Sequence, residues 1–151
     1  MAKKRLLKWM FVCCVLALLV TGILLYSHYA KESEFCNFGR NLNCDIVNKS
    51  IYAELFGIPV AILGLLFYIG LGILLYGLLK EWDFTKIHEK LNNDVVGWVV
   101  LVASFIGVVF SYYLFYIEWK VIMTFCIFCI FQQLMITIIF TLSIVSKTRW
   151  H

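Results

Sequence analysis

Charged residues are scarce in this chain of 151 residues, at 15% of the total, and a single residue is proline. Soluble domains carry about 25% charged residues and roughly 45–50% apolar ones. Here 63% of the residues are hydrophobic, so a soluble fold of this length could not bury them all. The absence of low-complexity tracts also excludes long linkers. Residues 1–151 are therefore predicted to form one all-α integral membrane domain.

Four stretches of the chain contain no charged residue, and each is 22 to 26 residues long. A membrane-spanning helix needs about 20 mostly apolar residues. The stretches 9–30, 55–79, 95–117 and 121–146 are thus predicted to be transmembrane helices. The first is longer than the apolar region of a signal peptide and lacks a clear small-residue cleavage site, so we expect it to be retained.

Lysine and arginine are distributed unevenly between the two sides of this predicted bundle. One side would hold nine of the thirteen, namely Lys3, Lys4, Arg5, Lys8, Lys80, Lys86, Lys90, Lys147 and Arg149. The other side would hold Lys31, Arg40, Lys49 and Lys120. Because cytoplasmic loops are enriched in these residues, we predict a multi-pass plasma membrane protein with both termini in the cytoplasm. The net charge of +4 follows from this bias and indicates no nucleic-acid partner.

The loop 31–54 and the connection near 118–124 would then face outward, where disulfides form and persist. Cys126 and Cys129 form a CxxC motif at the outer start of the fourth predicted helix. Their spacing places both thiols on one helical face, close enough to form a disulfide. A helix start carries unpaired amides and partial positive charge, which favour the thiolate that attacks disulfides. The motif therefore predicts redox-active thiols.

Cys36 and Cys44 lie in the outward loop, separated by seven residues that include Gly39 and three asparagines. Such a pair can simply staple a loop, which would make the chain a structural tetraspan protein. Two pairs on one side can instead exchange disulfides with each other as a relay. Zinc binding by the four thiolates is a further alternative, but only one pair has the short spacing of a zinc site, and no metal is expected.

Two other features complete the pattern. Cys13 and Cys14 lie in the cytoplasmic half of the first helix and are expected to pack there, with palmitoylation as a lesser alternative. Gln133 shares the helical face of Cys126 and Cys129 and could donate a hydrogen bond to the carbonyl of a quinone between the helices. A plain helix–helix hydrogen bond is an equal alternative. No charged residue lies within any predicted span, which argues against a transporter or channel.

In this order along the chain, these features resemble the vitamin K epoxide reductase family over about residues 9–146. The resemblance is carried by Cys36-x7-Cys44, Ser50, Phe56-Gly57-Ile58-Pro59 with Gly64 and Tyr68, and Phe125-Cys126-x-x-Cys129. It implies a four-helix bundle around a quinone (ubiquinone, menaquinone or phylloquinone), with the outward loop between the first two helices as a cap. It also implies that Cys36 and Cys44 exchange with a thioredoxin-fold protein, and that Cys44 passes electrons to Cys126.

By the same resemblance, Cys129 faces the quinone and Ser50 belongs to the active-site region. The segment around Gly57 is most similar to prokaryotic members, which generate disulfides. Vertebrate members carry a tyrosine at the position of Gln133 and an asparagine at that of Ala53. Because this chain differs from them at both positions, disulfide generation is the expected activity and epoxide reduction is the alternative. Many prokaryotic members carry a fused thioredoxin-like domain, whereas this chain ends at His151, so we expect the partner to be a separate polypeptide.

Overall fold

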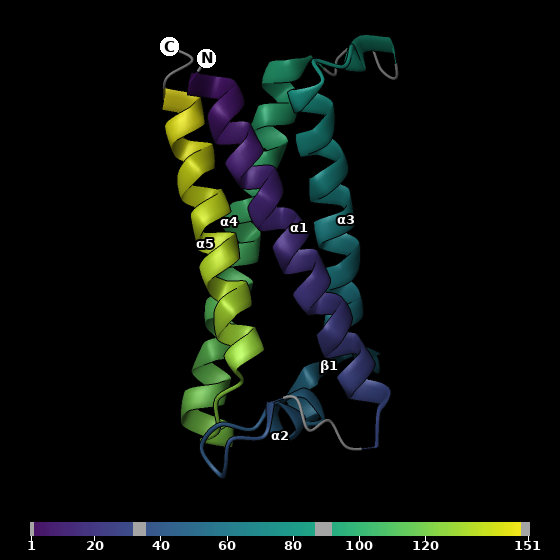
Figure 1. Cartoon of the computed structure of the whole chain (residues 1–151), viewed down its shortest axis with the longest axis vertical. Coiled ribbons are helices and arrows are strands. Elements are labelled where there is room, and N and C mark those ends of the chain that lie inside the picture. The colour runs from purple at the N-terminus through teal and green to yellow at the C-terminus, as the bar shows by residue number, and fades with distance from the viewer. Residues whose placement is uncertain (1, 32–35, 87–91, 149–151) are drawn as a thin grey trace.

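The computed structural model describes residues 2–31, 36–86 and 92–148. Four long helices run side by side through the molecule (Figure 1). They are α1 (Ala2–Tyr29), α3 (Val60–Leu79), α4 (Asn93–Ile117) and α5 (Ile127–Thr148). Each is long and apolar enough to cross a membrane. The predicted four-helix membrane bundle is therefore confirmed.

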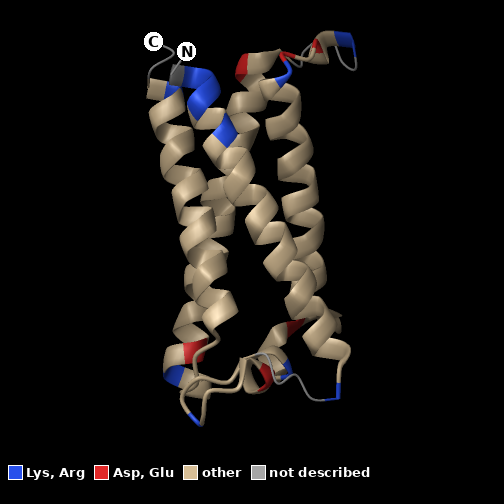
Figure 2. Cartoon of the chain, in the orientation of Figure 1, with Lys and Arg blue, Asp and Glu red and all other residues tan. Residues whose placement is uncertain are grey.

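The two ends of the bundle differ in what they carry. Both termini and the connection between α3 and α4 lie at one end, which we call the terminal end (Figure 1). The segment between α1 and α3 closes the opposite end, which we call the cap end. Charged residues gather at both ends and leave the middle of the bundle free of charge (Figure 2). Lys90 and Arg149, which were counted in predicting the orientation, lie outside the described residues.

The cap is a short helical segment held against α1. It contains α2 (Cys44–Asn48) and the 3-10 turn η2 (Ile51–Ala53). The side chain of Asn43 begins α2 by accepting hydrogen bonds from the backbone amides of Asp45 and Ile46. The buried Asn48 amide donates to the Leu24 carbonyl at 2.6 Å and to the Ser27 hydroxyl at 3.0 Å. These bonds fix the cap over the end of α1.

A two-stranded hairpin replaces the start of the second predicted helix. Strand β1 (Glu54–Leu55) pairs with β2 (Ile58–Pro59), and α3 begins only at Val60. The turn residues Phe56 and Gly57 have φ angles of 54° and 79°, the left-handed geometry of a tight hairpin turn. The stretch 55–79 is apolar throughout, and apolarity alone does not distinguish a short hairpin from a helix start.

The boundary between the third and fourth long helices also differs from the one that the charge-free stretches predict. Beyond α4 the chain continues as a π-helical turn, η4 (Glu118–Ile122), which ends at Met123 in the left-handed region with φ 55°. The next residues extend along the cap, where Phe125 pairs with Leu42 in a parallel bridge. Consequently α5 begins at Ile127, six residues later than the charge-free stretch 121–146. Conversely, α1 includes the charged residues before Trp9, because charge ends a membrane span without ending a helix.

Two clusters of buried side chains hold the bundle together. The terminal-end core is apolar and joins all four helices through Leu7, Met10, Cys13, Cys14, Ala17, Tyr68, Leu71, Leu75, Leu78, Phe84, Val96, Val100, Ile136 and Ile139. The cap-end core is smaller and contains Leu24, Cys36, Cys44, Val47 and Cys126. Three of its five members are cysteines, so the sulfur chemistry predicted from the sequence is concentrated at the cap end.

Candidate active site

The loop cysteines are joined in a disulfide at the cap. Cys36 and Cys44 have Cα atoms 5.4 Å apart and are both buried. The chain between them turns back at Gly39, whose φ of 111° suits glycine. An antiparallel bridge between Asn37 and Asn43 closes the turn. Cys44 is also the first residue of α2, so the Asn43 cap holds the backbone next to it.

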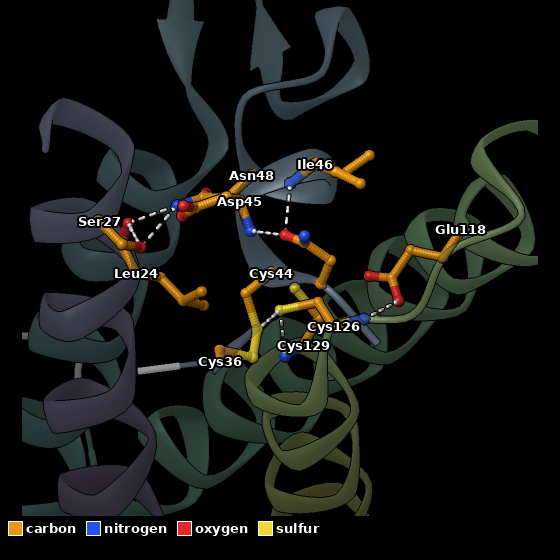
Figure 3. The surroundings of a disulfide bond; sticks show 11 residues. Leu24, Ser27, Cys36, Cys44, Asp45, Ile46, Asn48, Glu118, Cys126 and Cys129 are labelled. Carbon is orange, nitrogen blue, oxygen red and sulfur yellow. Dashed lines mark hydrogen bonds between the residues drawn. A yellow bond between two sulfur atoms is a disulfide. The ribbon is translucent and has the colours of Figure 1, made fainter. Parts of the chain in front are cut away.

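Cys126 lies directly against this disulfide. It is fully buried, and its Sγ is 3.0 Å from the Sγ of Cys44 (Figure 3). Hydrogen bonds from Phe125 N to the Asn41 carbonyl and from Asn43 N to the Phe125 carbonyl hold the segment in place. The two predicted cysteine pairs, 82 residues apart in sequence at their nearest members, are therefore brought into contact.

Cys129 occupies the first turn of α5 and is partly exposed. Its backbone amide donates a hydrogen bond to the Cys126 Sγ at 3.3 Å. This amide is one of the unpaired donors at a helix start, and such donors stabilise a thiolate. Cys126 and Cys129 are both free thiols in this structure. Their arrangement supplies a nucleophilic sulfur beside the loop disulfide.

A cavity of about 370 Å³ lies inside the bundle beneath the cap. Residues of all four long helices and of the cap form its wall. Cys129, Gln133 and Ser50, each singled out from the sequence, all lie in this wall. Ser50 donates its hydroxyl to the Val47 carbonyl at 2.7 Å, which holds it at the edge of the cap. The cavity thus connects the CxxC motif to an apolar space large enough for a small ring molecule.

The sequence predicts two alternative roles for Gln133, a hydrogen bond to a quinone and a hydrogen bond between helices. Gln133 lines the cavity, as the helical face predicts. Gln132 also lies in the wall, and its amide nitrogen donates to the Ala17 carbonyl at 2.8 Å and to the Thr21 hydroxyl. Gln132 Oε1 is buried and has no hydrogen-bond partner within the described part of the chain. A helix–helix hydrogen bond is thus made by Gln132 and not by Gln133, the residue for which it was predicted as an alternative, while Gln133 lines the cavity.

Glu118 is a site residue that the sequence reasoning missed. The sequence predicts only that it belongs to the outward-facing connection near 118–124. The structure buries it, with 3% of its surface exposed, and places it in the cavity wall. Its Oε2 accepts a hydrogen bond from the Cys126 backbone amide at 3.2 Å (Figure 3). The available signal was its position eight residues before the first cysteine of the CxxC motif.

The zinc alternative conflicts with the state of the sulfurs. Cys36, Cys44 and Cys126 have their sulfur atoms within 4.8 Å of one another. However, two of these three sulfurs are joined in a disulfide, and zinc is bound by thiolates. Cys129 does not belong to this group of neighbouring sulfurs. The arrangement fits disulfide exchange between Cys44 and Cys126.

A four-helix membrane bundle with two touching cysteine pairs beside an internal cavity defines a class of membrane proteins that carry a thiol–disulfide centre. Within this class, the chain matches the Vitamin K epoxide reductase family over residues 8–144. It belongs to that family, whose members are membrane oxidoreductases linked to quinones and to thioredoxin-like partners. A comparison with curated protein sequences finds no match.

Proposed function

We propose that this protein is a thiol:quinone oxidoreductase that oxidises a separate thioredoxin-fold protein and thereby drives disulfide formation outside the cytoplasm. One observation carries the proposal. The Cys44 and Cys126 sulfurs are 3.0 Å apart, while Cys129 lies in the wall of the cavity. Electrons can therefore pass from the cap, through two adjoining cysteine pairs, to a substrate inside the bundle.

The relay has three exchanges. First, the dithiol of the thioredoxin-fold partner reduces the Cys36–Cys44 disulfide and becomes a disulfide itself. Next, the Cys44 thiolate attacks Cys126 in the Cys126–Cys129 disulfide, so that Cys129 leaves as a thiolate. The Cys36 thiolate then attacks Cys44, which restores the loop disulfide and releases Cys126. The two protons that the partner dithiol brings in are taken up by the Cys126 and Cys129 sulfurs, so the helix pair becomes a dithiol.

The cavity suits a quinone as the second substrate. Small-molecule sites are largely apolar and typically enclose about 300–1,000 Å³, and this cavity falls within that range. Gln133 would hold a ring carbonyl through its amide nitrogen. The unpartnered Oε1 of Gln132 would accept a hydrogen bond from a quinol hydroxyl. When bound, the quinone takes two electrons and two protons from the helix pair, which returns to the disulfide. Ubiquinone, menaquinone and phylloquinone all carry the two ring carbonyls that this site requires.

The orientation belongs to the same proposal. Disulfide exchange with a secreted partner requires the cap end to face outward, and the excess of lysine and arginine at the terminal end supports this placement. Cys36 and Cys44 also border a second cavity of about 410 Å³, lined by α1 residues and by Phe128. The loop disulfide therefore adjoins free space, and Cys126 is not among the residues that line it.

The test is quinone reduction by the purified protein in detergent. With dithiothreitol or a reduced thioredoxin-fold protein as electron donor, quinone absorbance is followed for the wild type and for Cys129→Ala. We expect steady loss of quinone with the wild type and a decrease of at least about 10³-fold in the variant, as for other residues that form covalent intermediates. Cys13→Ala, which likewise removes one free thiol, is the matched control and should retain the wild-type rate.

Comparison of ubiquinone, menaquinone and phylloquinone in this assay identifies the acceptor. Equal rates for the wild type and Cys129→Ala would contradict the relay. A wild type that reduces no quinone, while both cysteine pairs stay oxidised in the presence of the donor, would establish the structural alternative.

A further inference from the structure

Glu118 is a buried carboxyl at the junction of the relay and the cavity. It begins the π-helical turn η4, and its side chain points from there toward the start of α5 (Figure 3). Its Oε2 accepts the Cys126 amide at 3.2 Å, and Glu118 and Cys129 both lie in the wall of the same cavity. Glu118 is therefore hydrogen-bonded to the first cysteine of the CxxC motif and lines the same cavity as the second.

The charge of this carboxyl is poorly compensated. Only 3% of its surface is exposed, and it takes part in none of the ion pairs found among the described residues. A buried carboxylate without a cationic partner is costly, and taking up a proton removes that cost. The same side chain lines the cavity in which reduction would occur. The Glu118 carboxyl is thus placed both to accept a proton from a thiol and to donate a proton into the cavity.

Resting on the proposed function, we propose that Glu118 carries protons from the CxxC thiols to the quinone. The carboxylate takes the proton of the Cys129 thiol as that sulfur gives up electrons, and the protonated carboxyl passes it to a quinone oxygen. The second proton, from the Cys126 thiol, follows by the same carboxyl. Two thiols lose two protons and two electrons and form one S–S bond, while the quinone gains both and becomes a quinol.

A purely structural role would also explain the hydrogen bond to Cys126, and substitution separates the two roles. Glu118→Gln keeps the size of the side chain and an oxygen that accepts the Cys126 amide, but it cannot carry a proton. Glu118→Ala removes both the acceptor and the carboxyl. The two variants therefore differ in structural support while being equal in proton transfer.

The experiment divides the cycle into two half-reactions in detergent-purified protein. In the first, dithiothreitol reduces the Cys36–Cys44 disulfide of quinone-free protein, and the freed thiols are alkylated and counted by mass spectrometry. In the second, prereduced protein is mixed with a single equivalent of a quinone, and quinol formation is followed by absorbance. For Glu118→Gln we expect the first rate to stay within about twofold of the wild type and the second to fall about 10²-fold, the lower range for general acid–base groups.

The remaining outcomes decide the matter as follows. Equal slowing of both half-reactions by Glu118→Gln would assign Glu118 to positioning Cys126 and overturn the proposal. A wild-type rate of quinol formation in Glu118→Gln, with slowing confined to Glu118→Ala, would overturn it as well. If the wild type itself formed no quinol, the proposed function would fail before the role of Glu118 was reached, so the two failures are distinguishable.

Discussion

Two pairs of free cysteines lie in this bundle, and their surroundings differ at every level. Cys13 and Cys14 belong to the apolar terminal-end core, where Cys14 donates its thiol to the Tyr68 carbonyl at 3.3 Å. Cys126 and Cys129 lie at the start of α5, where a backbone amide donates to sulfur and a disulfide is in contact. The thiols of Cys13 and Cys14 therefore act as small packing groups, whereas at Cys126 and Cys129 a hydrogen bond to sulfur and a neighbouring disulfide favour thiol–disulfide exchange.

Backbone geometry accounts for much of the contrast. Residues adjacent in a helix point in different directions, whereas residues three apart lie on one face. Cys13 and Cys14 are adjacent within α1, where backbone amides already bond along the helix. Cys126 and Cys129 are three apart at a helix start, where the amides lack helical partners. The comparison shows that reactivity depends on where a cysteine lies along its helix, and not on burial alone, since Cys126 and Cys14 are equally buried.

The largest expected effect is the selective formation of one disulfide. A double variant, Cys36→Ser with Cys129→Ser, leaves Cys44 and Cys126 as the pair at the cap end. Because their sulfurs are 3.0 Å apart, mild oxidation should link them in nearly every molecule. Non-reducing peptide mapping by mass spectrometry measures the yield.

A matched double variant tests whether proximity is the cause. Cys36→Ser with Cys126→Ser leaves Cys44 with Cys129, whose sulfur lies outside the group of neighbouring sulfurs, so linkage should be at least about tenfold slower. Cys13 and Cys14 should stay reduced in both variants. Equal disulfide yields in the two double variants would contradict proximity as the cause of linkage. A disulfide between Cys13 and Cys14 would contradict the conclusion that these two thiols only pack.

A smaller effect is expected from the polar lining of the cavity. Gln133→Leu keeps the volume of the side chain but removes the amide that would hold a quinone carbonyl. Loss of one neutral hydrogen bond costs about 1 kcal/mol, which corresponds to a roughly fivefold rise in KM for the quinone. Steady-state quinone reduction at varied quinone concentration measures this rise. Ser143→Ala, farther along α5 and buried in the terminal half, should leave KM unchanged; a similar rise there would show that the effect is not local to the cavity.

The fold was largely predictable from the sequence because lipid imposes a simple requirement. A span must be apolar and about 20 residues long, and four such stretches are plain in the composition. Helix ends were less predictable, since hydropathy does not report backbone geometry. The left-handed conformations of Phe56 and Met123 end or delay helices inside apolar stretches, and neither residue type signals such a conformation.

The candidate site was predictable where it depends on cysteine spacing and unpredictable where it depends on packing. The two pairs and the face of Gln133 followed from the order and periodicity of the residues. Contact between Cys44 and Cys126 was expected only through resemblance, because it requires the cap to fold onto the start of α5. The burial of Glu118 and the unpartnered oxygen of Gln132 depend on how the four helices pack around a common space. Neither could be predicted from the residues next to it in the sequence.

The smallest expected effects compare the packing of the two ends at glycine. Among the residues that the structure describes, a Cβ atom on Gly72, near the Cys13–Cys14 pair, would meet only the Cys14 Sγ, at 3.6 Å, an ordinary contact. A Cβ atom on Gly107, beside the cavity, would lie 3.0 Å from Ile136 Cγ1 and 3.2 Å from Phe67 Cζ. Since alanine is favoured over glycine within helices, Gly72→Ala should stabilise the protein by up to about 1 kcal/mol.

Gly107→Ala should instead cost about 1 kcal/mol, because Ile136 and Phe67 must shift, and both side chains line the cavity. Displacement toward the cavity would narrow it, so the KM for the quinone should rise about twofold at most, a small change for one added methyl group. Thermal unfolding in detergent, followed by circular dichroism, measures the first effect, and quinone kinetics measure the second. If Gly72→Ala were as destabilising as Gly107→Ala, or if it raised the KM equally, the terminal end would be coupled to the cavity. In that case the terminal-end core and the cavity would not differ in how well they tolerate an added methyl group.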